Sequence, residues 1–450
     1  MRIESEQNIM SKKETAELGL LENISKVEIV SKNKKQTYIG IALLIALIIF
    51  GKFQYAKNSK LALFLITGLA VGYVMQRSRF GFAGGVKKIY VTGDKTLTKA
   101  LMFLFAISLL ITASIHYGAF MDGADVQYRA VEAGIKAIPG TASVKPTNLG
   151  TVIGGVLFGI GMMFGGGCAS GTLTDAGEGE IRALIVLFFF VTGSLIGVNH
   201  MPWWEQSIFF KVGKKVYLPD VFGYLGAIIV SLLGFLLIYI IAKKYESKRK
   251  RENTYTKDEY SDWEKPLSET ADYKFFSKET YHKFFVQRWS FYTGAVAVTI
   301  MFVAIILTTG KSWGVTSTFA DWGAWLYQSV GLVDVSNWPW FASRMKKING
   351  GILNDPSSMR NIGILLGATL SLLLARRFSF KKNFKFRDVA FYAIGGLMMG
   401  YGARVGLGCN AGALYSAICN LSLSGWVFLP AMTVGGIIGV NLVRKFKVTI

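Results

Sequence analysis

The sequence predicts an all-α, polytopic membrane protein on three compositional grounds. Of its 450 residues, 52% are hydrophobic and 17% are charged, whereas roughly a quarter of the residues in soluble domains are charged. The mean hydropathy is positive. Glycine is abundant, with 50 residues, and proline is scarce, with 8, as in membrane helices whose backbones pack closely.

Apolar segments long enough to cross about 30 Å of hydrocarbon recur along the chain. We expect about ten long transmembrane helices, because a span of this kind needs a nearly continuous apolar run. They are predicted at residues 39–56, 61–76, 99–119, 149–166, 181–200, 220–242, 291–309, 361–376, 387–404 and 424–442.

A long charged segment at 243–290 is too polar to enter lipid and divides the chain into two membrane halves. The sequence therefore predicts four parts. These are a polar N-terminal segment (1–37), a first membrane half (38–242), the charged loop (243–290) and a second membrane half (291–450). Each half is expected to contain two repeat units.

The formal net charge of +22 comes from Lys and Arg residues that cluster beside the apolar segments, as at 243–251 and 376–382. Positive charge gathers on the cytoplasmic loops of membrane proteins. We therefore place the charged loop and both chain ends in the cytoplasm. This pattern predicts contact with membrane lipid and argues against a nucleic-acid partner.

An internal repeat interrupts the apolar segments. Residues 155–171 contain two glycines, a cysteine and a further glycine in the spacing G-x3-G-x8-C-x2-G. Residues 396–412 have identical spacing, so Cys168 and Cys409 occupy equivalent positions. Broken backbone at membrane depth is tolerated only where protein or a water-filled cavity surrounds it. We therefore expect short re-entrant helices that line a central pathway.

Two further copies of the repeat are weaker. Residues 68–84 keep the spacing, with Gly81 at the cysteine position, and residues 307–323 hold a degenerate copy. With the charged loop and both ends inside, first-half units enter from outside and second-half units from the cytoplasm. Opposite orientations of this kind are the inverted repeats of transporters.

Cys168 and Cys409 each precede a short helical segment, whose N-terminus favours an anion. Thiol sulfur is soft and its S–H group is a weak donor, which suits a substrate containing sulfur or selenium. A buried cysteine is otherwise a small hydrophobic residue, but the repeated, glycine-flanked position favours a binding role. The candidate substrate-binding residues are Cys168, Cys409, Arg404, Gly81, Gly167 and Gly408. Cys419 has no counterpart and is expected to pack.

Several ionisable residues lie near these breaks. Arg404 stands five residues before Cys409 and is the candidate for attracting a divalent oxyanion, because charge at membrane depth is usually functional or paired. For Arg77 and Arg79 two interpretations stay equally open: attraction of substrate, or extension to the cytoplasmic surface. The charged residues 175–182 are expected to orient the short helix after Cys168, and His116 to lie at the external interface.

The stretches FGIGMMFGGGCASGTL and GYGARVGLGCNAGALYSA resemble motifs of the YeeE/YedE family of sulfur-transport membrane proteins, and the resemblance covers residues 40–245 and 290–445. The resemblance implies thiosulfate uptake through a narrow interior, with the anion passed between cysteines by S–H···S and S–H···O hydrogen bonds. It implies relay roles for Cys168 and Cys409. The family commonly has cysteine where this chain has Gly81, which receives no such role. A cytosolic TusA-like sulfurtransferase is the implied partner.

We therefore expect a transporter of the cell inner membrane that imports a small sulfur-containing anion, with thiosulfate as the first candidate. The alternatives are a transporter of selenium compounds, a membrane-embedded sulfur-transfer protein whose cysteines form persulfides, and a structural subunit that docks a partner on the charged loop. The sequence contains no nucleotide-binding loop, metal-ligand cluster or nucleophile–base arrangement. We expect no cofactor, no metal ion and no enzymatic activity.

Overall fold

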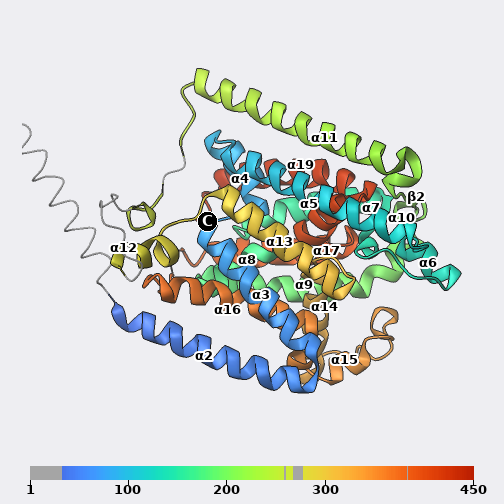
Figure 1. Cartoon of the computed structure of the whole chain (residues 1–450), viewed down its shortest axis with the longest axis horizontal. Helices are drawn as coiled ribbons and strands as arrows, with labels where there is room; N and C mark the ends of the chain where they lie inside the picture. Colours follow the sequence, from blue (N-terminus) through green and yellow to red (C-terminus); the bar gives the residue numbers. More distant parts are fainter. Residues whose placement is uncertain (1–32, 258–259, 267–276, 383, 450) are drawn as a thin grey trace, which may run out of the picture.

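The computed structural model describes residues 33–257, 260–266, 277–382 and 384–449, so most of the predicted N-terminal segment lies outside the described residues. Ten of the described helices have 16 residues or more and form the body of the molecule (Figure 1). The all-α prediction is confirmed. The long helices are α2 (Lys34–Lys57), α3 (Ser59–Ser78), α5 (Thr96–Met121), α7 (Leu149–Phe164), α9 (Ile181–Gln206), α11 (Leu218–Arg251), α13 (Phe291–Thr309), α16 (Pro356–Leu374), α17 (Asp388–Val405) and α19 (Leu423–Phe446).

Short elements connect the long helices. The short α-helices are α4 (Phe82–Thr92), α6 (Gln127–Ala133), α8 (Ala169–Gly177), α10 (Ile208–Lys211), α12 (Lys278–Tyr281), α14 (Thr316–Ser329), α15 (Met345–Asn349) and α18 (Ala417–Cys419). Six further helical turns are η1 (Thr141–Ser143), η2 (Asp262–Glu264), η3 (His282–Val286), η4 (Pro339–Phe341), η5 (Ile352–Asn354) and η6 (Asn410–Ser416). Strands β1 (Pro146–Asn148) and β2 (Gly213–Lys215) pair antiparallel, with Thr147 opposite Lys214.

In the described part of the chain, nine helical segments are long and apolar enough to cross a membrane, and they coincide with nine of the ten predicted spans. The tenth is α17, which carries Asp388 and Arg404 within its 18 residues. It packs against both α7 and α9. Asp388 is buried and accepts hydrogen bonds from the backbone N–H groups of Lys385 and Thr449, both at 3.3 Å. Packing and paired polar groups, rather than hydropathy, therefore hold α17 in the bundle.

Three pairs of long helices pack in parallel with their backbones in contact: α3 with α16, α7 with α19, and α9 with α17. Each pair takes one helix from each predicted half. In the first pair, Gly68 lies against Arg360 and Gly72 against Ile364, and a Cβ atom at Gly72 would lie 2.0 Å from the Ile364 carbonyl oxygen. Glycine allows this approach, as in other membrane helix pairs. We call these three contacts the glycine seams.

The long helices that lead to the two repeat cysteines run in opposite directions. Gly154, early in α7, lies against Gly406, just after α17. Gly161, later in α7, lies against Gly395, in the first half of α17. α7 and α17 therefore pack antiparallel, as the inverted repeat predicts.

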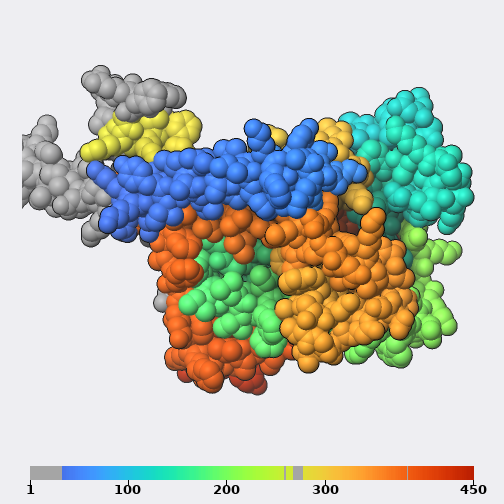
Figure 2. Space-filling view, turned by 90° about the horizontal axis from the view of Figure 1, so that it is seen from below, coloured from blue at the N-terminus to red at the C-terminus, as the bar shows by residue number. Residues whose placement is uncertain are grey.

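α2 and α11 lie at opposite margins of the bundle (Figure 1), and α2 runs along one edge of the surface (Figure 2). Only 17% of the apolar window of α2 and 22% of that of α11 are buried inside the protein. Large apolar side chains such as Ile48, Phe53, Leu225 and Leu237 are exposed on them. Exposed apolar surface of this extent suits hydrocarbon rather than water.

Most of the predicted charged loop (243–290) lies within the described residues. α11 continues as a helix to Arg251, past the predicted end of its span. Further along, the chain packs under the end of α3, where the Arg77 guanidinium donates to the carbonyl groups of Phe285 and Val286 at 2.8 and 2.5 Å. The backbone N–H of Trp289 donates to the Arg77 carbonyl at 3.1 Å. The residues just before α13 therefore pack against the C-terminal end of α3.

Candidate functional site

The three clear copies of the repeat break the chain at one structural position. Gly81, Cys168 and Cys409 are the N-cap residues of α4, α8 and η6, and all three have extended backbone conformations. Each short helix follows a long one, namely α3, α7 and α17 respectively. Residues that occupy the same position in the sequence repeat therefore also occupy the same position in the structure, at the start of a short helix.

Charged side chains hold the break before Cys168. Gly166 has φ +78°, a left-handed conformation that favours glycine. The guanidinium of Arg182, from α9, donates to the Gly165 carbonyl and pairs with the Asp175 carboxylate of α8 at 3.0 Å. One arginine therefore connects the end of α7 to α8, because its planar fork can serve two acceptors at once.

Close packing holds the break before Cys409. Gly408 has φ +153°, and a Cβ atom there would lie 2.8 Å from the amide nitrogen of Ala413. The Ala413 N–H donates to the Cys409 carbonyl at 2.6 Å, just as the Thr172 N–H donates to the Cys168 carbonyl at 2.7 Å. The two short helices begin alike, although different contacts support the chain before them.

The degenerate fourth copy also forms a broken helix, in which α13 is followed by a break and then by α14. Thr316 is the first residue of α14. Its hydroxyl, together with the backbone N–H groups of Ala411 and Gly412, lies close enough to the Cys409 sulfur to influence its charge. Thr316 is not apparent from the sequence because its copy lacks both the cysteine and the matching glycines. Its place directly after the break is the one signal available.

The short helices meet inside the bundle. α4 and α8 both contact η6, and the side-chain amide of Asn410 lies 3.8 Å from the Met162 sulfur. Cys168 and Cys409 are each 1% exposed. The two thiols are close enough for the charge of one to act on the other. Both are therefore enclosed by protein in this structure.

Four buried polar atoms on these broken segments have no hydrogen-bond partner among the described residues. They are Thr172 Oγ1, Trp313 Nε1, Thr318 Oγ1 and Asn410 Oδ1. An unpaired buried polar group costs about 1–3 kcal/mol, and few such groups remain in native proteins. The indole N–H can only donate, and a threonine hydroxyl can donate as well as accept. Donors of this kind are what an anion-binding region requires.

Aromatic rings surround the beginning of α4. The ring centroid of Phe82 lies 5.4 Å from that of Tyr415 and 6.0 Å from that of Trp313. Cys419 is fully buried, with its sulfur 3.9 Å from the Phe105 carbonyl oxygen. Its place among these core residues agrees with the expectation that it packs.

Two of the candidate glycines are not required by the backbone. At Gly81, no atom lies within 4 Å of the position of a Cβ atom, and φ is −145°. At Gly167, the nearest atom to such a Cβ would be 3.5 Å away, an ordinary contact. The residues that do require glycine are Gly166 and Gly408. Of the two neighbours Gly166 and Gly167, it is therefore Gly166 whose backbone conformation and surroundings require glycine.

Arg404 lies on α17 and is 5% exposed. Its guanidinium carbon stands 5.6 Å from the ring centroid of Trp340. Its Nε atom has no hydrogen-bond partner in the described part of the chain. Cys409 and Asp321 both lie within its electrostatic range. The structure thus brings Arg404 near Cys409, while its role as an attracting charge stays a prediction.

Arg77 and Arg79 make structural contacts. Arg77 is 1% exposed, so the interpretation that it extends to the surface is wrong; it binds carbonyl groups instead. Arg79 forms ion pairs with Glu178 at 2.7 Å and Glu264 at 3.1 Å. It therefore connects the end of α3 to the chain after α8 and to the segment before α13.

His116 does not lie at an interface, contrary to the prediction. It is completely buried on α5, where its ring nitrogens hydrogen-bond the Tyr217 hydroxyl at 3.0 Å and the Asn420 side chain at 3.1 Å. The sequence places His116 near a helix end but does not reveal that other segments cover it.

The chain matches the family model described as sulphur transport over residues 77–438. It is 25% identical over 379 residues to the thiosulfate transporter TsuA of Escherichia coli (strain K12). The aligned region covers 82% of this chain and 91% of that protein. The thiosulfate transporter TsuA of Spirochaeta thermophila is 23% identical over 384 residues, or 81% of this chain and 93% of that protein.

A shorter match is to the probable transporter YedE of Escherichia coli (strain K12), 28% identical over 158 residues, or 35% of this chain and 39% of that protein. The family match begins at Arg77, beside the first break, and ends within α19. It therefore includes all the broken segments described above. The chain is a polytopic α-helical membrane protein that belongs to the sulphur transport family.

Proposed function

We propose that the protein imports thiosulfate across the cell inner membrane, along a pathway that passes Cys168 and Cys409. One observation carries the proposal. The two thiols cap short helices that follow antiparallel long helices, both are buried, and each lies within electrostatic range of the other. Thiosulfate is also the substrate named for the two TsuA relatives, which align with 82% and 81% of this chain.

The chemistry of the site fits an anion that carries both sulfur and oxygen. The thiols offer S–H donors to the soft terminal sulfur. The unpaired donors of Thr172, Trp313 and Thr318 offer harder hydrogen bonds to the oxygens. Hydrogen bonds to a charged group are worth about 1.5–3 kcal/mol each. A bound anion would therefore satisfy groups that are otherwise buried without partners.

The positive-inside pattern gives the proposed pathway a direction. With both ends and the 243–290 segment in the cytoplasm, Arg404 and Cys409 lie nearer the outside and Cys168 nearer the cytoplasm. The anion meets the arginine first and is then passed inward. A TusA-like sulfurtransferase would receive it at the cytoplasmic face. Because both thiols are enclosed, the short helices must shift to admit the anion.

Uptake of radiolabelled thiosulfate into proteoliposomes tests the proposal. Cys168→Ala and Cys409→Ala should each slow uptake at least about tenfold, because the loss of one hydrogen bond of about 1.4 kcal/mol in the rate-limiting step has this effect. Cys419→Ala removes the same atom from a cysteine outside the repeat and should leave uptake near the wild-type rate.

Wild-type uptake by both variants, with melting temperatures unchanged, would contradict the proposed pathway. Sulfate, sulfite and selenite as competitors define the substrate: stronger competition by selenite than by unlabelled thiosulfate would favour a selenium compound. Mass spectrometry after exposure to thiosulfate completes the test. Transport leaves both cysteines unmodified, whereas a persulfide on either one would favour sulfur transfer.

A further inference from the structure

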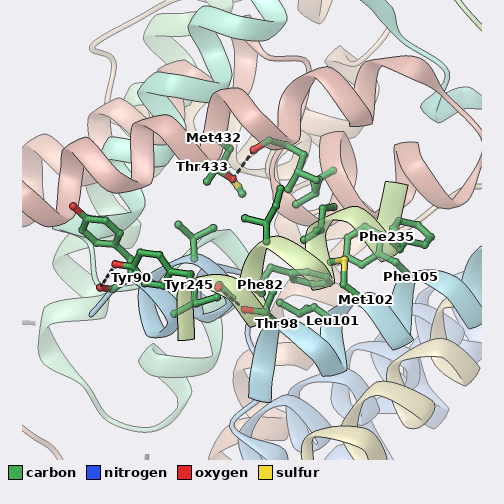
Figure 3. A pocket seen from close by; sticks show the side chains of 18 of the residues that line it. Phe82, Tyr90, Thr98, Leu101, Met102, Phe105, Phe235, Tyr245, Met432 and Thr433 are labelled. Carbon is green, nitrogen blue, oxygen red and sulfur yellow. Dashed lines mark hydrogen bonds between the residues drawn. The ribbon is translucent and has the colours of Figure 1, made fainter. Parts of the chain in front are cut away.

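A cavity of about 270 Å³ is lined in part by the short helix α4 and by the η6–α18 segment. Its walls come from α4, α5, α11, α19 and the η6–α18 segment, and neither repeat cysteine lines it. The lining is almost entirely apolar. Figure 3 shows Phe105 and Phe235 at one end of the cavity and Tyr90 and Tyr245 at the other.

The lining of the cavity reaches the surface of the protein on α11. α11 and α19 meet where the Phe235 and Trp426 rings stack, with centroids 5.1 Å apart. Beyond that contact, Ile241 of α11 and Thr433 of α19 both line the cavity. Ile241 is 58% exposed, as is much of the outer face of α11. The rim of the cavity therefore belongs to the surface that faces hydrocarbon.

Two arginines stand at the tyrosine end. Tyr90 stacks on Tyr245, with centroids 6.3 Å apart, and the Arg444 guanidinium lies 5.7 Å from the Tyr90 ring. Arg249 donates to the Val91 carbonyl at 2.9 Å, and its Nε is buried without a hydrogen-bond partner among the described residues. This end of the cavity is the one at which α4, α11 and α19 all finish.

The carboxylate of Glu246, on the adjoining turn of α11, does not cancel this charge. It is already paired with Lys95 and Lys250, both at 2.6 Å. Lys248, Arg251 and Lys445 add further positive charge at the same helix ends. An apolar cavity next to a basic rim is complementary to a molecule with a hydrocarbon chain and an anionic head.

We propose that this cavity binds an anionic phospholipid, with one acyl chain inside it and the phosphate at Arg249 and Arg444. Dry apolar cavities take up apolar molecules, and the bilayer presents acyl chains directly at this surface. Basic groups near the cytoplasmic end of membrane helices attract anionic head groups. The proposal concerns lipid binding alone and does not depend on the identity of the transported anion.

The bound chain supports the short helices from behind. Phe82 is the first residue of α4, and Leu414 belongs to η6; both line the cavity. Each segment begins directly after an N-cap position of the repeat, Gly81 for α4 and Cys409 for η6. The lipid thus fills the space into which α4 and η6 would otherwise relax.

Filling the cavity with a side chain tests the proposal. Thr433→Trp places an indole inside it, and Ile437→Trp does so from the next turn of α19. Val434→Trp is the matched control, because Val434 is 52% exposed and does not line the cavity. The full chain is reconstituted in vesicles of equal parts phosphatidylcholine and phosphatidylglycerol with identical acyl chains. It is then extracted in mild detergent and weighed by native mass spectrometry.

The wild type and Val434→Trp should retain one phosphatidylglycerol per chain, and the two filling variants at least fivefold less. Arg249→Gln with Arg444→Gln should abolish the preference for phosphatidylglycerol over phosphatidylcholine, whereas Lys248→Gln with Lys445→Gln should preserve it. Melting temperatures identify any variant that fails to fold. Equal retention by a folded filling variant overturns the site, and a preference that survives the double arginine change overturns the head-group assignment. A lipid-free dimer of the wild type would show that a second copy covers the cavity instead.

Discussion

The breaks before Cys168 and Cys409 place the same residue in the same N-cap position by different means. At Cys168, Arg182 and Asp175 hold the chain through an ion pair and a bond to a backbone carbonyl. At Cys409, Gly408 packs its backbone against Ala413. Because two unlike sets of contacts give one geometry, the position of the thiol, rather than any one supporting contact, is the shared feature of the two units.

Gly408→Ala should have the largest effect, because it disrupts the break before Cys409 and leaves the contacts at the Cys168 break unchanged. The added Cβ atom meets the Ala413 amide nitrogen at 2.8 Å, and the positive φ disfavours any L side chain. We expect a loss of about 3 kcal/mol in the free energy of unfolding and no measurable uptake. Gly412→Ala is the control, since no atom lies within 4 Å of its Cβ position. Equal melting temperatures for the two variants would show that close packing does not hold this break.

Arg182→Ala should have the next largest effect, confined to the Cys168 break. It removes the ion pair to Asp175 and leaves the Gly165 carbonyl without its donor. We expect a loss of about 2 kcal/mol in stability, because the arginine is mostly buried, together with slower uptake. Lys381→Ala removes a neighbouring pair to Glu180 that is one-third exposed and should cost less than about 1 kcal/mol. Thermal melting in detergent compares the two, and a larger loss for Lys381→Ala would contradict this account.

Gly81→Cys should have the smallest effect on stability, within about 0.5 kcal/mol, because no atom lies within 4 Å of the position of its Cβ atom. It restores a thiol at the third N-cap position, and uptake should stay at the wild-type rate or rise. In Gly84→Cys the Cβ atom would lie 2.6 Å from Leu97 Cδ2, so that variant should be less stable. A Gly81→Cys protein that folds but loses uptake would show that the first break differs in function from the other two.

The sequence predicted the long helices and the equivalence of the three N-cap residues, because the glycine spacing that marks each break is local. It did not predict the contacts between segments that are distant in the chain. Arg182 bonding to Gly165, Thr316 reaching Cys409 and His116 being covered by Tyr217 all depend on tertiary packing.

The end of α11 was also outside the prediction, for a different reason. Hydropathy marks where a segment leaves lipid, not where its helix ends. Lys, Arg and Glu are good helix formers, and Glu246 pairs with Lys250 one turn later on the helix. The helix therefore continues beyond the apolar span into the charged segment.

The glycine seams divide the molecule into positions that can vary and positions that cannot. A single methyl group at Gly72 would collide with the backbone of α16, so the frame admits almost no substitution there. Gly81, in contrast, has room for a Cβ atom. The frame can thus stay constant while an N-cap position changes its chemistry. Substitution at such an open position of the backbone would leave the packing of the long helices as it is.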